Sequence, residues 1–318
     1  MIDNYKLTGC KLVLALCVFF TSHYAVSQNV RSAFEVMQDM LDASAKTNYS
    51  GLATYEKSGR LKTLQFTHLS RSGKTLERTV RLDGPIGDDY LWREQDCALY
   101  NDSIQFGVFA SGKSTNLAKL SQLYTFELRG QHRVANRLST AILVNPKDQF
   151  RLPYLITVDN QSDLMLKSVI LDNAGKPLER LQFVNIQIGG ELDTLEVSAD
   201  AIAPCQETSI NGALASYQPS WIPPGYTSVL TDLDPRLNQT MTTFSDGLAS
   251  FSVFVESAQI SAMLPPFLSS SGATSAVSIK VDIGASELTV SVVGEISMET
   301  AEKIARSVVP ASEIRQNP

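Results

Sequence analysis

One segment of the sequence has the spacing of a phosphate-binding motif. Residues 107–114, GVFASGKS, match the pattern G-x-x-x-x-G-K-S, whose backbone N–H groups and lysine hold nucleotide phosphates. That loop works at the carboxyl edge of a parallel sheet with crossover helices. This sequence instead has short apolar runs separated by tight-turn residues, which indicates antiparallel strands. We therefore interpret the match as coincidental and expect no nucleotide or other cofactor.

The other reactive residues form no known catalytic pattern. The sequence has no G-x-S-x-G, H-E-x-x-H or C-x-x-C motif. His68 sits at strand spacing with Leu64 and Phe66, which is typical of a half-buried structural residue rather than of a base. We predict no catalytic residue, no metal ligand and no enzymatic activity, so binding is the expected kind of function.

The first 27 residues have the features of a secretory signal peptide. Lys6 and Lys11 precede an apolar run over residues 12–20, and the small-residue pattern Ala25-Val26-Ser27 ends the segment. The apolar run is shorter than the roughly 18–20 residues that span a bilayer as a helix. We predict cleavage after Ser27 and an exported, soluble product.

Composition sets limits on what the exported chain can be. The 318 residues are 43% hydrophobic, which is enough to build a core, and their number favours two domains. The formal net charge of −6 argues against a nucleic-acid partner, because such proteins cluster Lys and Arg against phosphates. In an oxidising compartment Cys97 and Cys205 either form a disulfide or stay as buried thiols, and the sequence leaves both alternatives open.

A helix followed by a long sheet is expected over residues 28–205. The helix covers residues 31–46, and one of its faces carries Phe34, Met37, Leu41 and Ala45. Alternating apolar runs joined by turn residues then predict one twisted antiparallel sheet, with the helix packed on its concave face. Two of these runs are Leu152, Tyr154, Ile156 and Val158, and Val184, Ile186 and Ile188.

The pattern changes at a predicted linker over residues 206–220, and a smaller α+β domain is expected over 221–318. Asp246-Gly247 lies between two alternating runs and predicts a hairpin with a two-residue turn. The Ser-rich stretch 259–275 predicts a long flexible loop. Ser297 predicts the start of a last helix.

Aromatic residues mark two candidate binding regions. A curved sheet lined by apolar side chains can hold an acyl chain, because each buried methylene contributes about 0.8 kcal/mol. Ordinary core packing explains the same residues, and Trp221 and Phe251 are interpreted as core. The candidates for a lipid cavity are Phe66, Trp92 and Tyr154. The candidates for contact with a protein partner are Tyr226, Phe244, Ser245, Asp246 and Gly247.

Several segments form a recognisable set by their order and spacing. They are Leu82-Asp83-Gly84-Pro85, Arg133-Val134-Ala135-Asn136-Arg137, Trp221-Ile222-Pro223-Pro224-Gly225-Tyr226, Phe244-Ser245-Asp246-Gly247-Leu248 and Gly294-Glu295. With them the sequence resembles the RseB/MucB family over essentially the whole exported chain. The match is poor over residues 105–123, which include the phosphate-loop pattern.

This resemblance implies a fold and a function. The fold is α+β: an N-terminal unclosed antiparallel β-barrel with helices, similar to bacterial lipoprotein carriers, and a smaller C-terminal α+β domain. The function is that of a periplasmic negative regulator of sigma-E, which binds the periplasmic part of a membrane-spanning anti-sigma factor and protects it from proteolysis. Lipopolysaccharide or lipoprotein acyl chains are implied as the releasing signal. The alternative is a periplasmic lipid or lipoprotein carrier, and homo-oligomerisation stays open.

Overall fold

The computed structural model describes residues 31–71, 73–84, 92–94, 116–202, 217–234, 239–257, 266–284 and 286–314. The predicted signal peptide, the phosphate-loop pattern at 107–114, Cys97 and Cys205 lie outside these described residues. All the helices and strands below belong to one compact unit, Ser32–Pro318.

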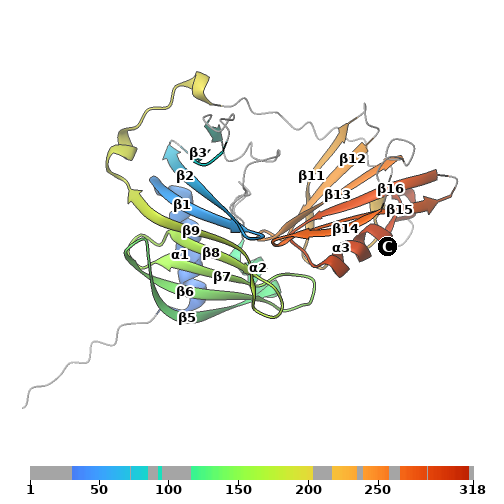
Figure 1. Cartoon of the computed structure of the whole chain (residues 1–318), viewed down its shortest axis with the longest axis horizontal. Coiled ribbons are helices and arrows are strands. Elements are labelled where there is room, and N and C mark those ends of the chain that lie inside the picture. The colour runs from blue at the N-terminus through green and yellow to red at the C-terminus, as the bar shows by residue number, and fades with distance from the viewer. Residues whose placement is uncertain are drawn as a thin grey trace, which may run out of the picture. The chain divides into compact units, whose positions relative to one another are not determined.

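The N-terminal part, residues 32–202, is a nine-stranded antiparallel sheet with helices α1 (Ala33–Lys46) and α2 (Leu117–Leu123) (Figure 1). The strand order is β4-β3-β2-β1-β9-β8-β7-β6-β5. The strands are β1 (Tyr49–Lys57), β2 (Arg60–Arg71), β3 (Lys74–Arg81), β4 (Arg93–Glu94), β5 (Tyr124–Val134), β6 (Arg137–Pro146), β7 (Tyr154–Asp159), β8 (Met165–Leu171) and β9 (Pro177–Ile188). Two short 3-10 turns, η2 (Gly190–Thr194) and η3 (Ala199–Ala201), follow β9. Among the described residues β4 and β5 have no second neighbour, so the sheet is open.

Helix α1 begins at a capping box and packs on one face of this sheet. The Ser32 hydroxyl accepts a hydrogen bond from the Glu35 amide at 3.2 Å, and the Glu35 carboxylate accepts one from the Ser32 amide at 2.7 Å. Of the predicted apolar face only Met37 is fully buried, whereas Phe34 stays 40% exposed. The face that packs on the sheet follows the spacing i, i+3, i+4, i+7 and consists of Ala33, Val36, Met37 and Met40.

A β-bulge changes which side chains of β9 are buried. Leu52 pairs with Asn185 but the next residue, Ala53, pairs with Phe183, so Val184 is the extra residue. The Asn185 side chain accepts a hydrogen bond from the Leu52 amide at 2.9 Å. The prediction that Val184 shares a face with Ile186 and Ile188 was therefore wrong at this position, where Val184 is 58% exposed.

The C-terminal part, residues 217–314, is a second open antiparallel sheet with the order β11-β12-β13-β16-β15-β14 (Figure 1). Its strands are β11 (Thr227–Asp234), β12 (Gln239–Ser245), β13 (Ser250–Ser257), β14 (Phe267–Ser271), β15 (Thr274–Ile283) and β16 (Ser286–Gly294). Helix α3 (Met298–Arg306) packs on β15 and β16, and a small sheet pairs β10 (Tyr217–Pro219) with β17 (Val308–Pro310) before α4 (Ala311–Ile314).

The predicted α+β class, with antiparallel sheets that do not close, is confirmed. The prediction of a flexible loop over 259–275 was wrong for residues 267–271, which form edge strand β14 paired with β15. All five residues of β14 are exposed. An edge strand of this kind needs only backbone pairing, so its sequence carries no apolar alternation to reveal it. Residues 258–265 lie outside the described part of the chain.

Each sheet has its own apolar core, and one core receives residues from both parts. The C-terminal core joins β12, β13, β15, β16 and α3 around Phe251, Val290 and Ile304. The N-terminal core joins α1, α2, β6 and β7 but also contains Leu248 and Ala273 from two turns of the C-terminal part. The N-terminal and C-terminal parts therefore meet at a shared packed surface, called the junction below.

Candidate functional site at a buried polar junction

The turn that follows β12 is held by its own aspartate. Asp246 Oδ1 accepts hydrogen bonds from the amides of Leu248 and Ala249 at 2.9 and 2.8 Å. The turn between β12 and β13 thus covers residues 246–249, not the two residues predicted. Because Oδ1 is used within the turn, Oδ2 is left to face the N-terminal part.

Arg151 is the partner of that carboxylate across the junction. Its side chain has no exposed surface, and its Nε donates to Asp246 Oδ2 at 2.8 Å. The two terminal nitrogens of the guanidinium donate to Asp148 and to the carbonyl oxygen of Pro224. A buried guanidinium is tolerated only when its charge and its donors are matched, and here both conditions are met.

Two tyrosines enclose this ion pair. The Tyr124 hydroxyl donates to Asp246 Oδ2 at 2.9 Å, and the Arg151 guanidinium carbon lies 5.9 Å from the Tyr124 ring centre and 4.8 Å from that of Tyr226. Burial, and then the negative charge of Asp246, raise the pKa of both phenols well above their ordinary value. Both rings therefore stay neutral, and Arg151 is the positive charge of the group.

A second polar group lies around Glu179 of β9. Its carboxylate accepts a hydrogen bond from the Tyr55 hydroxyl at 2.5 Å, pairs with Lys57 Nζ at 2.9 Å, and accepts the amide of Ala273 at 2.9 Å. Lys57 also donates to the Thr274 hydroxyl at 2.8 Å. One carboxylate thus ties β1 and β9 of the N-terminal part to the β14–β15 turn of the C-terminal part.

Glu295, directly after β16, faces the same region. Its carboxylate accepts a hydrogen bond from the Tyr154 hydroxyl at 3.1 Å. Desolvation is the largest cause that raises the pKa of Glu295 to about 7, and the charge of Glu179 raises it further. With a pKa of about 7, the Glu295 carboxyl changes its charge near neutral pH.

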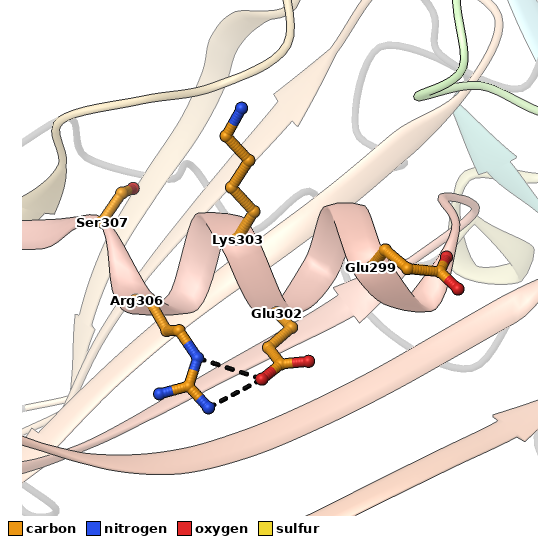
Figure 2. Close-up of a pocket in the computed structure, with 5 residues that line it drawn as sticks. All are labelled: Glu299, Glu302, Lys303, Arg306 and Ser307. Carbon is orange, nitrogen blue, oxygen red and sulfur yellow. Dashed lines mark hydrogen bonds and ion pairs between the residues drawn. The ribbon is translucent and has the colours of Figure 1, made fainter.

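A shallow pocket on α3 lies beside an aromatic contact of the junction. Phe150 and Trp221 meet edge to face at 5.3 Å, and Lys303 Nζ lies 3.7 Å from the Trp221 ring centre. The pocket is lined by Glu299, Glu302, Lys303, Arg306 and Ser307. Figure 2 shows Arg306 and Glu302 paired on one side of α3 while Lys303 points to the other. Two acids and two bases give this pocket no net preference for a charged ligand.

The predicted partner-interface residues lie directly before β11, at the end of β12 and in the turn that follows, and most of them are buried. Tyr226 and Phe244 belong to the C-terminal core, and Asp246 is bound to Arg151. Ser245 and Gly247 are half-buried. Phe251 is core as predicted, with 1% exposure, and Trp221 is partly buried.

The predicted lipid-cavity residues are all buried and lie in three separate apolar clusters. Phe66 packs edge to face on Phe183 at 5.8 Å. Trp92 forms a bridge with Ile202 and lies under the Arg78 guanidinium at 4.8 Å. Tyr154 belongs to the core beneath α1. The described structure does not bring the three side chains into one cluster.

Sequence reasoning missed most of the polar residues of the junction. Arg151 and Glu179 have no local pattern that marks them for the junction, because Asp246 and Ala273, which they bond in the C-terminal part, are 95 and 94 positions away. Gly272 offers a weak signal as a glycine in a turn: its φ is +57°, and a Cβ there would lie 2.5 Å from Glu179 Oε1. Glu295 was singled out only as part of a family-like segment.

Other kinds of site receive no support from the described residues. Within them, no group of three or more His, Cys, Asp or Glu side chains is placed to hold a metal ion. No helix in the described ranges is both long enough and apolar enough to cross a membrane.

Comparison with known proteins adds a family. The MucB/RseB N-terminal domain model matches residues 32–201, and the MucB/RseB C-terminal domain model matches residues 212–309. The sigma factor AlgU regulatory protein MucB of Pseudomonas aeruginosa is 28% identical over 87% of this chain and 91% of that protein. The sigma-E factor regulatory protein RseB of Escherichia coli K12 is 26% identical over 86% of this chain and 89% of that protein.

Solved structures agree with this. The chain superposes on MucB in a crystal structure with MucA(peri) with a TM-score of 0.68 at 27% identity, covering 87% of this chain and 98% of that one. A Pseudomonas aeruginosa MucA/MucB complex gives a TM-score of 0.69 with the same identity and coverage. Since the two domain models together cover most of the sequence, in the expected order, the chain belongs to the MucB/RseB family.

Proposed function

We propose that this protein is a periplasmic, non-enzymatic negative regulator of a sigma-E-type envelope-stress response. It binds the periplasmic part of a membrane-spanning anti-sigma factor and protects that part from proteolysis until a lipid-like envelope signal releases it. The observation that carries the proposal is the family match over both parts of the chain, together with relatives named as sigma factor regulators. The family match and the signal-peptide pattern of residues 1–27 support the proposed periplasmic location.

The partner-binding surface is proposed to lie mainly on residues 221–318, around the turn after β12. Ser245 and Gly247 are half-buried and keep some surface that a partner can contact. Tyr226, Phe244 and Asp246 would support that surface from beneath, since their side chains are already packed or bonded within the chain. Substituting them is expected to act on the partner through the position of the turn.

The lipid signal is proposed to act on the apolar interior of the N-terminal part. Phe66, Trp92 and Tyr154 are buried, so an acyl chain would have to displace neighbouring side chains to reach them. For Tyr154 the displacement would also disturb the hydrogen bond to Glu295, which links the interior of the sheet to the junction. Through this hydrogen bond, a lipid that enters the N-terminal part acts on the C-terminal part.

A protease-protection assay tests the proposal. The purified exported chain is mixed with the periplasmic segment of the anti-sigma factor from the same organism, and cleavage of that segment is followed with and without lipopolysaccharide or lipoprotein. Slower cleavage in the presence of the chain, restored by the lipid, is the expected result. Lipid binding without any effect on the segment would favour the alternative, a lipid or lipoprotein carrier. No binding to either would contradict both functions.

A further inference from the structure

Two carboxylates of the junction have very unequal partners. The Glu179 carboxylate forms an ion pair with Lys57 and accepts hydrogen bonds from the Tyr55 hydroxyl and the Ala273 amide, so its negative charge is compensated. Glu295 receives only the Tyr154 hydroxyl among the contacts that the structure describes, at 3.1 Å. Glu295 is half-buried, and its carboxylate gains no cation of its own in that position.

The charges that face Glu295 do not make up for this lack. Glu179 and Asp246 are acidic and disfavour ionisation of Glu295, whereas Lys57 favours it. Lys57 is already paired with Glu179, and Arg151 with Asp246. The ionisable groups coupled to Glu295 are Tyr55 and Lys57 of β1, Tyr154 of β7, Glu179 of β9, Tyr226, and Asp246 of the turn after β12. An ionised Glu295 therefore adds a negative charge beside two ion pairs, Lys57–Glu179 and Arg151–Asp246, whose own charges are already matched.

We propose that Glu295 makes the junction proton-sensitive: the N-terminal and C-terminal parts hold together most firmly while the Glu295 carboxyl is protonated, and separate more readily once it ionises. The geometry supports this because Glu295 lies in the C-terminal part, while Tyr154, Glu179 and Lys57 lie in the N-terminal part. Opening the junction moves Glu295 away from Glu179 and exposes it more fully to water.

The direction of the effect follows from proton binding. In the closed junction Glu295 has a pKa of about 7, against an ordinary value of 4.5. Between these two values the closed form binds a proton that the open form does not, so closure is favoured as the pH falls from 7 towards 4.5. Opening is expected to become easier by up to about tenfold for each pH unit between them, or about 300-fold at most, and to level off above pH 7.

Hydrogen exchange of the intact exported chain measures this opening. The Ala273 amide is a suitable reporter, because it donates to Glu179 across the junction and is released when the two parts separate. Deuterium uptake of a peptide covering residues 267–276 is followed by mass spectrometry from pH 5 to pH 8, after correction for the intrinsic pH dependence of exchange. We expect protection to fall by up to about a hundredfold between pH 5 and pH 7 in the wild-type chain.

Three variants decide the outcome. Glu295→Gln keeps the shape but cannot ionise, so its protection should stay nearly constant with pH. Glu299→Gln changes an exposed acid of α3 and should behave as the wild type. Tyr154→Phe removes the hydrogen bond that favours the ionised form, so the fall in protection should move to higher pH. A wild-type profile equal to that of Glu295→Gln, or an unmoved midpoint in Tyr154→Phe if Glu295→Gln does not fold, overturns the proposal.

Discussion

Arg151 and Asp246 depend on each other because both side chains are fully withdrawn from water. Removing Arg151 leaves the Asp246 carboxylate charged in a site that water does not reach. Removing both side chains leaves only Asp148 without its ion-pair partner, and Asp148 is partly exposed to water. The pair is thus a test of how much of the junction is held by charge rather than by packing.

We predict that Arg151→Met lowers the free energy of unfolding by about 3–5 kcal/mol, because Asp246 is then buried without a cation. The double variant Arg151→Met with Asp246→Leu should lose clearly less than the single one. Urea denaturation followed by circular dichroism measures both. Arg306→Met is the control, since its pair with Glu302 on α3 is exposed and exposed pairs contribute at most about 1 kcal/mol. A double variant as unstable as the single variant would contradict this account.

Arg137, the last residue of the family-like segment Arg133-Val134-Ala135-Asn136-Arg137, binds a buried carboxylate. Arg137 donates to the buried Asp159 carboxylate at 2.8 Å, and Ser162 donates to the same oxygen at 2.6 Å from its hydroxyl. Burial raises the pKa of Asp159, but the hydrogen bonds from Arg137 and Ser162 outweigh it, so the net direction is down. A lowered pKa means that this stabilisation is present above the ordinary value of 3.8 and is lost as the pH falls through the folded-state pKa.

Arg137→Met should therefore cost about 1.5–3 kcal/mol of stability at pH 7, and less in strong acid where Asp159 is protonated. Thermal unfolding followed from pH 7 down through the acid range below the ordinary value of 3.8 measures the difference. Arg133→Met is the matched control, because Arg133 lies in the same segment but is exposed and bonded only to Asn136 at 3.0 Å. Equal losses for the two variants at pH 7 would refute the assignment.

At the scale of elements, the predictions from the sequence succeeded where one pattern dominates locally. The strand containing Tyr154, Ile156 and Val158 buries all three side chains, and Ser297 caps α3 as predicted. The predictions failed where pairing with a distant strand determines which side chains are buried. Val184 is the example, because a bulge in the pairing with β1 sets its orientation. The polar contacts between the two parts could not be predicted for the same reason, since those of Arg151 and Glu179 with the C-terminal part join residues 73 to 95 positions apart.

The β14–β15 turn supplies a prediction at this scale. Gly272 has a φ of +57°, and a Cβ there would lie 2.5 Å from Glu179 Oε1. Gly272→Ala should therefore push the turn off Glu179, expose the Ala273 amide to exchange, and cost more stability than backbone strain alone, which is about 1–3 kcal/mol.

Gly284→Ala is the control for that strain. Gly284 has a similar φ of +62° but no atom within 4 Å of the added Cβ. Differential scanning calorimetry of both variants separates the two contributions. If the two variants lower the melting temperature equally, and the Ala273 amide stays protected in Gly272→Ala, then the close approach of residue 272 to Glu179 contributes nothing to stability.

At the scale of the whole molecule, the apolar core of the N-terminal part includes residues of the C-terminal part, whereas the core of the C-terminal part includes none from the N-terminal part. The C-terminal core is built entirely from residues of the C-terminal part. The N-terminal core borrows Leu248 and Ala273, which are 7% and 3% exposed in the intact chain. Separation therefore leaves the C-terminal core complete and exposes apolar surface on both sides of the junction.

The last prediction concerns the fragment 211–318 on its own. It should fold, because its six-stranded sheet and α3 enclose their own core, but Asp246 and Leu248 should become accessible to water. It should also keep measurable affinity for the periplasmic segment of the anti-sigma factor, since the proposed partner surface lies on it. Calorimetric titration of the intact chain, of 211–318 and of 28–210 against that segment measures this. If 211–318 folds without binding while 28–210 binds with full affinity, the partner surface lies in the N-terminal part, and the residues around Asp246 serve the junction alone.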